Sequence, residues 1–214
     1  MYLFSRRAQL SGARLRDAMG WAVAAGERVT QTTGLPIGVW SQVYSPGVGT
    51  LVWATFVPDL ATLEGATDKL AVDDAYNELG DRAVEFVLPG TVDDSLSVVV
   101  HGEPDPNRQI EYVASVRGTI AAGKIAKGMA LGVEIAQKAE QITGVPTAFV
   151  GDATGNYGGV AWLTGFANVG ALEAAEMALN TDESFIDLID KKASEVYSAV
   201  PGATTQLIYR RISG

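Results

Sequence analysis

The stretch Thr33-Gly34-Leu35-Pro36 decides the fold, because it returns 110 positions later as Thr143-Gly144-Val145-Pro146. At the same offset other identical residues coincide, namely Tyr2 with Tyr112, Ser5 with Ser115, Arg7 with Arg117, Met19 with Met129, Val23 with Val133 and Gln31 with Gln141. A one-residue deletion in the loop near Gly49 and Gly159 changes the offset to 109. The match then resumes with Trp53 on Trp162, Thr55 on Thr164, Leu63-Glu64 on Leu172-Glu173, Leu70 on Leu179, Asp73 on Asp182 and Leu79 on Leu188. Composition alone would not give so many identities, so the chain is a tandem duplication.

The first half of each copy contains a strand followed by a helix. In the first copy, residues 2–9 alternate between apolar and polar side chains, as a strand does. Ser11 is placed to cap a helix whose apolar residues recur at helical spacing. Gly34 and Pro36 then predict the end of that helix.

The second half of each copy predicts a hairpin, helices and a last strand. Residues 37–44 and 50–57 are rich in β-formers and flank a Pro-Gly turn, which indicates a hairpin. Asp59 opens a helical region in two pieces, with Asp73 placed to cap the second piece. A strand over residues 95–100 closes the copy. The order is β-α-β-β-α-β, the split βαβ unit of the ferredoxin-like fold.

The second copy repeats this order from Ile110. We expect a helix over 121–143, hairpin strands over 147–153 and 159–166, helices within 168–200 and a last strand over 205–212. The junction between the copies is polar and rich in proline, as expected of a short linker. The predicted organisation is a first ferredoxin-like repeat at 1–102, a linker at 103–109 and a second repeat at 110–214.

Composition limits the classes of function. The 214 residues are 47% hydrophobic and 19% charged, enough to bury a core. A net charge of −9 would repel a phosphate backbone, so we expect neither nucleic acid nor a membrane as partner. No apolar stretch approaches the roughly 20 residues that span a bilayer. The chain has no cysteine, which is compatible with a reducing compartment. The prediction is a cytoplasmic protein whose first residues belong to the fold.

The run from strand into helix at 53–76 carries Trp53, Thr55, Leu63-Glu64, Leu70 and Asp73, and the run at 162–185 repeats it. Both resemble the dimeric α+β barrel superfamily, which includes antibiotic-biosynthesis-monooxygenase-like and NIPSNAP-like domains. The resemblance implies an α+β fold in which two tandem ferredoxin-like repeats form an intramolecular barrel. It also implies a range of functions, among them cofactor-free monooxygenases, haem-dependent enzymes, isomerases and ligand-binding domains.

Cofactor and metal chemistry are not predicted. Haem enzymes of the tandem type use an axial histidine, and the single histidine, His101, lies at a strand end beside the linker. A structural or solvent-exposed role is expected for it. The chain has neither a cysteine nor a pair of histidines to bind a metal. The glycine-rich run from Gly151 to Gly159 lies between two strands and opens no helix, so we interpret it as a hairpin turn and not a phosphate loop.

Two aromatic residues are candidate ligand-binding residues because the duplication preserves them. Trp53 shares a strand face with Thr55, and Trp162 shares one with Thr164. An aromatic ring beside a hydroxyl can line a pocket for an apolar ring that carries one polar group. Packing of the tryptophans in the core between two sheets is the alternative.

Three charged residues and one tyrosine complete the candidate site. Arg7 and Arg117 place the same cation on a covered strand in both copies; they can bind an anionic group or pair with a carboxylate such as Asp152. Asp152 replaces Gln42, and Asn156-Tyr157 replaces Pro46-Gly47. The hairpin of the second copy is therefore the more polar one, and a site is favoured there, with Asp152 as the candidate catalytic base.

Two functions remain open from the sequence. In the first, a barrel-type pocket binds a small apolar or aromatic molecule and oxidises it with molecular oxygen without a cofactor, as a monooxygenase-like enzyme. In the second, the chain is a non-enzymatic scaffold that assembles into a homo-oligomer. A pocket flanked by the candidate residues would favour the first function, and exposed apolar helix faces would favour the second.

Overall fold

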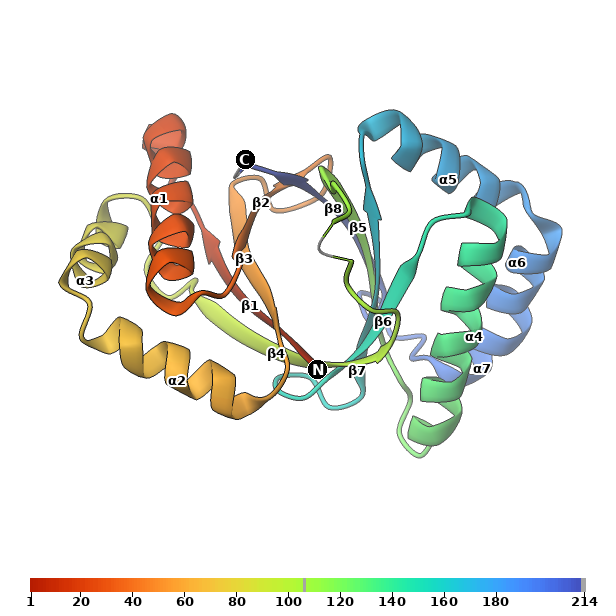
Figure 1. Ribbon diagram of the computed structural model, residues 1–214. Coiled ribbons are helices and arrows are strands. Elements are labelled where there is room, and N and C mark those ends of the chain that lie inside the picture. The colour runs from red at the N-terminus through yellow and green to blue at the C-terminus, as the bar shows by residue number, and fades with distance from the viewer. Residues whose placement is uncertain (106, 213–214) are drawn as a thin grey trace. The chain divides into compact units, whose positions relative to one another are not determined.

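The computed structural model describes residues 1–105 and 107–212 of the chain (Figure 1). Residue 106 of the predicted linker and residues 213 and 214 of the predicted second repeat lie outside the described residues. The order β-α-β-β-α-β occurs twice, as the duplication predicts. None of the described helices combines the length and the apolar character that a membrane crossing needs.

The elements of the first half follow the expected order. They are β1 (Tyr2–Gln9), the 3-10 turn η1 (Gly12–Arg14), α1 (Leu15–Thr33), β2 (Gly38–Val43), β3 (Thr50–Val57), α2 (Leu60–Ala71), α3 (Asp74–Asp81), the 3-10 turn η2 (Arg82–Glu85) and β4 (Asp93–His101). The second half comprises β5 (Tyr112–Thr119), α4 (Ile125–Thr143), β6 (Thr147–Asp152), β7 (Gly159–Phe166), α5 (Val169–Thr181), α6 (Glu183–Leu188), the π-helical turn η3 (Ile189–Ala193), α7 (Ser194–Val196) and β8 (Thr205–Arg211).

Helix ends follow the capping chemistry of the sequence, with one exception. The carboxylates of Asp59 and Asp73 accept hydrogen bonds from the backbone N–H groups of Thr62 and Tyr76, which confirms both as N-caps. Gly34 ends α1 in the left-handed conformation with φ of 81°. The prediction for Ser11 is wrong: it precedes the 3-10 turn η1 and not α1, and its side chain makes no capping bond.

Hydrogen bonding orders the strands as β1-β3-β2-β8-β5-β7-β6-β4, the order of a closed eight-stranded barrel. The fold class is therefore confirmed as α+β, with two ferredoxin-like repeats that contribute to a barrel of the dimeric α+β type. Within this order β1 and β3 form an antiparallel pair, as do β5 and β7. By its contacts the chain separates into a first unit, Met1–Leu96 with Arg210–Gly214, and a second unit, Ser97–Tyr209.

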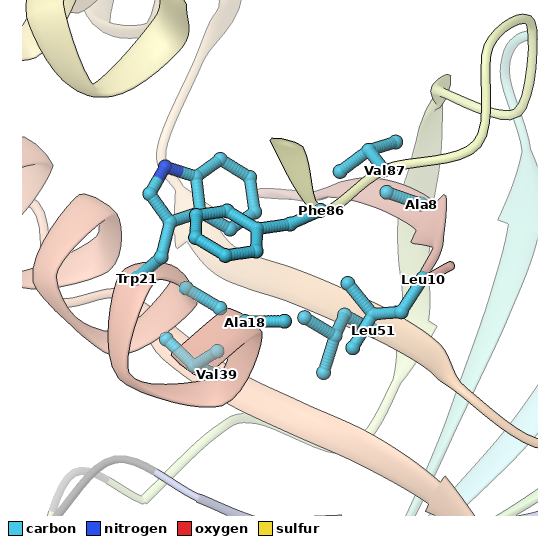
Figure 2. Close-up of a cluster of buried hydrophobic side chains, with 9 residues drawn as sticks. Ala8, Leu10, Ala18, Trp21, Val39, Leu51, Phe86 and Val87 are labelled. Carbon is cyan, nitrogen blue, oxygen red and sulfur yellow. The ribbon is translucent and has the colours of Figure 1, made fainter. Parts of the chain in front are cut away.

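In the first unit, the helix α1 covers one face of the strands and buries an apolar cluster (Figure 2). The rings of Trp21 and Phe86 lie 5.6 Å apart at the centre of this cluster. In the second unit, α4 packs on β6 and β7, and Phe149 lies fully buried below the helix. Each repeat therefore has a core of its own between a long helix and its sheet.

Backbone bonds align the two repeats more closely than the sequence does. Leu10 N–H donates to the Gly49 carbonyl, and Ile120 N–H donates to the Gly158 carbonyl. Gly49 therefore corresponds to Gly158, and Asn156-Tyr157 replaces Gly47-Val48 and not Pro46-Gly47 as predicted. The deletion falls earlier in the hairpin, because the strand pairing on both sides fixes the turn.

A second length difference lies near the end of the helices. The bridge between Leu10 and Val87 has its counterpart in the bridge between Ile120 and Tyr197, an offset of 110. Leu79 and Leu188 match at an offset of 109. The second repeat therefore contains one residue more in this segment, and the π-helical turn η3 absorbs it where the first repeat has the 3-10 turn η2.

Candidate functional site

The two candidate tryptophans lie in the core of their own units. Trp53 Nε1 donates to the carbonyl oxygen of Ala22 at 2.9 Å, and Trp162 Nε1 donates to that of Gly132 at 2.8 Å. Each indole thus contacts the helix that covers its sheet and uses its single N–H group there. The tryptophans therefore pack between a helix and its sheet, and not between two sheets as the alternative above had it.

A polar cluster of the second unit joins side chains from β5, β6 and β4, and β7 lies between β5 and β6. Arg117 Nη2, on β5, lies 3.2 Å from both carboxylate oxygens of Asp152, at the end of β6. Ser97 Oγ, on β4, donates to Asp152 Oδ1 at 3.0 Å. The Asp152 side chain is only 6% exposed, whereas that of Arg117 is 43% exposed. The carboxylate is held by its neighbours, and the guanidinium retains a surface that a ligand can reach.

Small residues on β7 make this cluster possible. Arg117 pairs across the sheet with Ala161, and Val150 pairs with Ala161 from the other side. A Cβ atom on Gly159 would lie 2.2 Å from Asp152 Oδ2, so only glycine leaves room for the carboxylate. The arginine side chain reaches over β7 because the residues between it and Asp152 have almost no side chain.

A cavity of about 600 Å³ lies at the same end of the second unit. It is lined by apolar residues where β5 leads into α4, namely Ile120, Ala121, Ala122, Ile125 and Ala126. Tyr157, 89% exposed, stands at this cavity, and Thr119 and Ser198 also line it. The volume falls within the range of small-molecule sites.

Thr119 connects the cavity with the polar cluster. It is two residues beyond Arg117 on β5, so the two side chains share a face of the sheet. Across the sheet it pairs with Gly159, the residue that abuts Asp152. Asn156 Nδ2 donates to Thr119 Oγ1 at 2.8 Å. The hairpin that carries Tyr157 is therefore tied to the strand that carries Arg117.

The first unit does not repeat this arrangement. Arg7 occupies the position of Arg117, pairs with Val52 across the sheet and is exposed. Gln42 occupies the position of Asp152, and its side-chain amide donates to the carbonyl of Pro46 in its own hairpin. The structure brings Arg117 and Asp152 together and places Tyr157 at the cavity that Thr119 also lines. It places Trp53 and Trp162 in the cores, and Arg7 in the first unit, away from this pair.

Ser97, Thr119 and Gly159 belong to this region and were not among the predicted site residues. Ser97 meets Asp152 through the pairing of β4 with β6, which sequence spacing does not show. The sequence carried a signal for Gly159, because a second glycine directly after Gly158 has no place in an ordinary hairpin strand.

His101 contacts a carboxylate and not the polar cluster. Its Nε2 atom lies 3.5 Å from Glu140 Oε2, and Glu140 Oε1 accepts a hydrogen bond from Thr147 N–H at 2.9 Å. Among residues 1–105 and 107–212, no group of three histidine, cysteine or acidic side chains is placed to hold a metal ion.

Tyr197 packs against the hydrophobic core of the second unit. Its hydroxyl donates to the Gly128 carbonyl at 2.7 Å, and its ring lies 5.4 Å from that of Trp162. Burial raises the pKa of the Tyr197 phenol, so the group stays protonated and acts as a hydrogen-bond donor.

Comparison with solved structures supports the fold. A putative monooxygenase from Fusobacterium nucleatum subsp. nucleatum ATCC 25586 is similar over 99% of this chain and 92% of its own, with 9% identity and a TM-score of 0.71. A putative monooxygenase from Lactobacillus acidophilus NCFM covers 99% and 94%, with 5% identity and a TM-score of 0.66. An anthrone oxidase-like protein covers 98% and 90%, with 10% identity and a TM-score of 0.64. No family model and no curated protein matches the chain.

Proposed function

We propose that the chain binds a small aromatic molecule in the cavity beside Tyr157 and oxidises it with molecular oxygen. The observation that carries the proposal is the Arg117–Asp152 pair, which Thr119 connects with a cavity of about 600 Å³ with mostly apolar walls. Such a combination provides an apolar surface for a ring and charged groups for one polar end. Structural similarity to two putative monooxygenases and an anthrone oxidase-like protein adds support.

The residues divide the work by their chemistry. Tyr157 and the alanines at the start of α4 contact the ring of the ligand. Asp152 accepts a proton from an activated C–H group of the ligand, and Arg117 stabilises the oxyanion of the resulting enolate. Ser97 holds the carboxylate in place through its hydrogen bond to Oδ1.

The proposed reaction converts a CH₂ group that is conjugated through an aromatic ring with a carbonyl into a second carbonyl. After Asp152 takes one proton, the carbanion adds molecular oxygen and forms a peroxide anion, which recovers that proton. The hydroperoxide then loses its second C–H proton, the O–O bond breaks, and water leaves. One O₂ oxidises one CH₂ to C=O and yields one H₂O, so no further electron donor enters the balance.

Anthrone is a suitable probe, because its reaction consumes one O₂ and gives anthraquinone and water. Binding is measured by calorimetry without oxygen, and turnover by an oxygen electrode together with anthraquinone absorbance. Asp152→Asn is expected to lower the rate by about 10²-fold or more while the affinity stays within about twofold. Saturable binding with an unchanged rate in Asp152→Asn would contradict the assigned role of Asp152.

The matched control for the cavity is the other exposed hairpin tyrosine. Tyr157→Ala is expected to weaken anthrone binding about fivefold, in keeping with the loss of one aromatic contact. Tyr44→Ala, in the hairpin of the first unit, should leave it unchanged. Absence of anthrone binding, with a native mass at a single large multiple of 22.5 kDa, would overturn the proposal in favour of a self-assembling scaffold.

A further inference from the structure

A second cavity, of about 490 Å³, lies in the second unit between α4 and the segment that contains α6 and η3. Its lining includes three lysines, Lys138, Lys191 and Lys192, in a chain whose net charge is −9. Two acidic side chains, Glu134 and Asp187, line it as well. The lysines exceed the carboxylates by one, so the lining is positive in a protein that is acidic as a whole, and it can attract negative charge.

The π-helical turn η3 supplies two of these lysines. It contains the residue by which the second repeat exceeds the first, and it places Lys191 and Lys192 at the groove. The first repeat has the tight 3-10 turn η2 at the corresponding place. Single π-helical turns concentrate at functional sites, because the inserted residue disturbs the helix and persists only where it is useful.

Lys138 takes the place of an arginine that is committed to structure in the first repeat. Arg28 Nε donates to both oxygens of Asp73 at 3.0 Å, and its Nη2 donates to Oδ1 at 2.9 Å. In the second repeat the corresponding carboxylate, Asp182, accepts instead from Ser184 Oγ and from Phe185 N–H. These two bonds are the main causes that lower the pKa of Asp182, and the charge of Lys138 is a smaller one.

The acidic residues of the groove form only exposed ion pairs with two of its lysines. Lys191 Nζ lies 2.7 Å from Asp187 Oδ2, and Lys192 Nζ lies 2.7 Å from Glu134 Oε1. All four of these side chains are about half exposed or more. Exposed ion pairs are weak and flexible, so an incoming anion with several charges can draw the ammonium groups away from their partners.

We propose that this groove binds a small polyanion, a molecule with two or more phosphate or carboxylate groups. Lys138 binds one anionic group, and Lys191 and Lys192 bind the other from the opposite wall. The site lies on the helical side of the second unit and shares no lining residue with the cavity beside Tyr157. It is a binding site in addition to the proposed oxidation site and does not depend on it.

Titration with inorganic pyrophosphate and, separately, with citrate tests the proposal on the full chain in 150 mM salt. Calorimetry gives the affinity, and amide chemical shifts give the location. We expect saturable binding of at least one of the two anions, with shifts confined to residues 134–141 and 184–192. Pyrophosphate alone would identify a phosphate ligand, and citrate alone would identify a carboxylate ligand.

Two variants separate a site from general attraction to lysine. Lys138→Met is expected to weaken binding about tenfold or more, because it removes a charge-assisted contact. Lys127→Met removes an exposed lysine from α4 outside the groove and should leave the affinity unchanged. Lack of saturable binding by both anions, or an equal loss in the two variants, would overturn the proposal.

Discussion

The two repeats share their backbone order and differ in what their charged side chains do. In the first unit Arg28 is bound by Asp73, and Arg7 is exposed. In the second unit the corresponding Lys138 faces a groove, and the counterpart of Arg7, Arg117, holds Asp152. The two copies thus share a scaffold, and the corresponding charged residues have different partners in each copy.

The cores of the two repeats also differ in the sizes of corresponding helix and strand residues. At corresponding positions the first repeat has Ala22 in α1 and Val39 in β2, both fully buried, and the second repeat has Gly132 in α4 and Phe149 in β6. A Cβ atom on Gly132 would lie 2.0 Å from Phe149 Cζ. The larger strand side chain is accommodated by the smaller helix residue, so each repeat keeps a close-packed interface by a different pair.

Gly132→Ala tests whether the small helix residue is needed beside Phe149, and it is expected to have the largest effect. The added methyl group collides with the buried ring, so we expect the free energy of unfolding to fall by about 3 kcal/mol. Phe149→Val introduces the residue of the first repeat and should relieve the collision, with a coupling energy of about 2 kcal/mol in a double-mutant cycle. Urea unfolding measures all four proteins. Additive effects would show that the sizes of the side chains at positions 132 and 149 are not coupled.

Arg117→Met and Arg7→Met compare the same position in the two units. Removal of Arg117 leaves the Asp152 carboxylate, 6% exposed, without its cation, and should cost about 2 kcal/mol of stability. Removal of the exposed Arg7 should change stability by less than about 0.5 kcal/mol. Chemical denaturation measures the free energy of unfolding of both variants. Equal decreases would contradict the conclusion that, among the described residues, the arginine has a partner only in the second unit.

Asp73→Asn and Asp182→Asn compare the two helix caps. Asp73 caps α3 and also accepts from Arg28 and from the Thr32 hydroxyl, whereas Asp182 lacks such an arginine. We expect the melting temperature to fall by about 4 °C in Asp73→Asn and by about half as much in Asp182→Asn. Calorimetric scans at pH 7 measure both melting temperatures. A larger decrease in Asp182→Asn than in Asp73→Asn would contradict the prediction.

The smallest effect is a dependence of stability on acid pH. Hydrogen bonds from Arg28, and then from Thr32 and the Tyr76 N–H, lower the pKa of Asp73 to about 2. A carboxyl whose pKa is lower in the folded state stabilises the fold above its unfolded value near 3.9, and this contribution disappears as the pH falls toward 2. Unfolding of the wild type and of Asp73→Asn should therefore converge between pH 4 and pH 2. A constant difference over that range would contradict the assignment.

The sequence predicted the repeated elements because hydrophobic periodicity and capping residues are local signals. Asp59, Asp73 and Gly34 end or begin helices where expected. It did not predict the π-helical turn η3, since a single inserted residue leaves no local pattern and shows only when backbone pairing fixes both sides. The predicted capping role of Ser11 was wrong because a 3-10 turn lies between it and α1.

The candidate site was predictable only in part. The pairing of Arg117 with Asp152 was one of two readings of the preserved arginine, and the structure shows that contact. Ser97 could not be found, because it reaches Asp152 through the pairing of distant strands. The tryptophans looked like pocket residues because they recur, but recurrence also marks core positions, and their N–H groups bond to helix carbonyls.

Hydrogen exchange with and without anthrone, measured anaerobically, tests most directly the claim that the second repeat carries the site. Protection is expected in residues 117–126 and 152–159, which form the cavity and the polar cluster. The corresponding residues 7–16 and 42–50 of the first repeat should exchange as in the free protein. Protection in both repeats, or in the first alone, would contradict the division of roles between the two units.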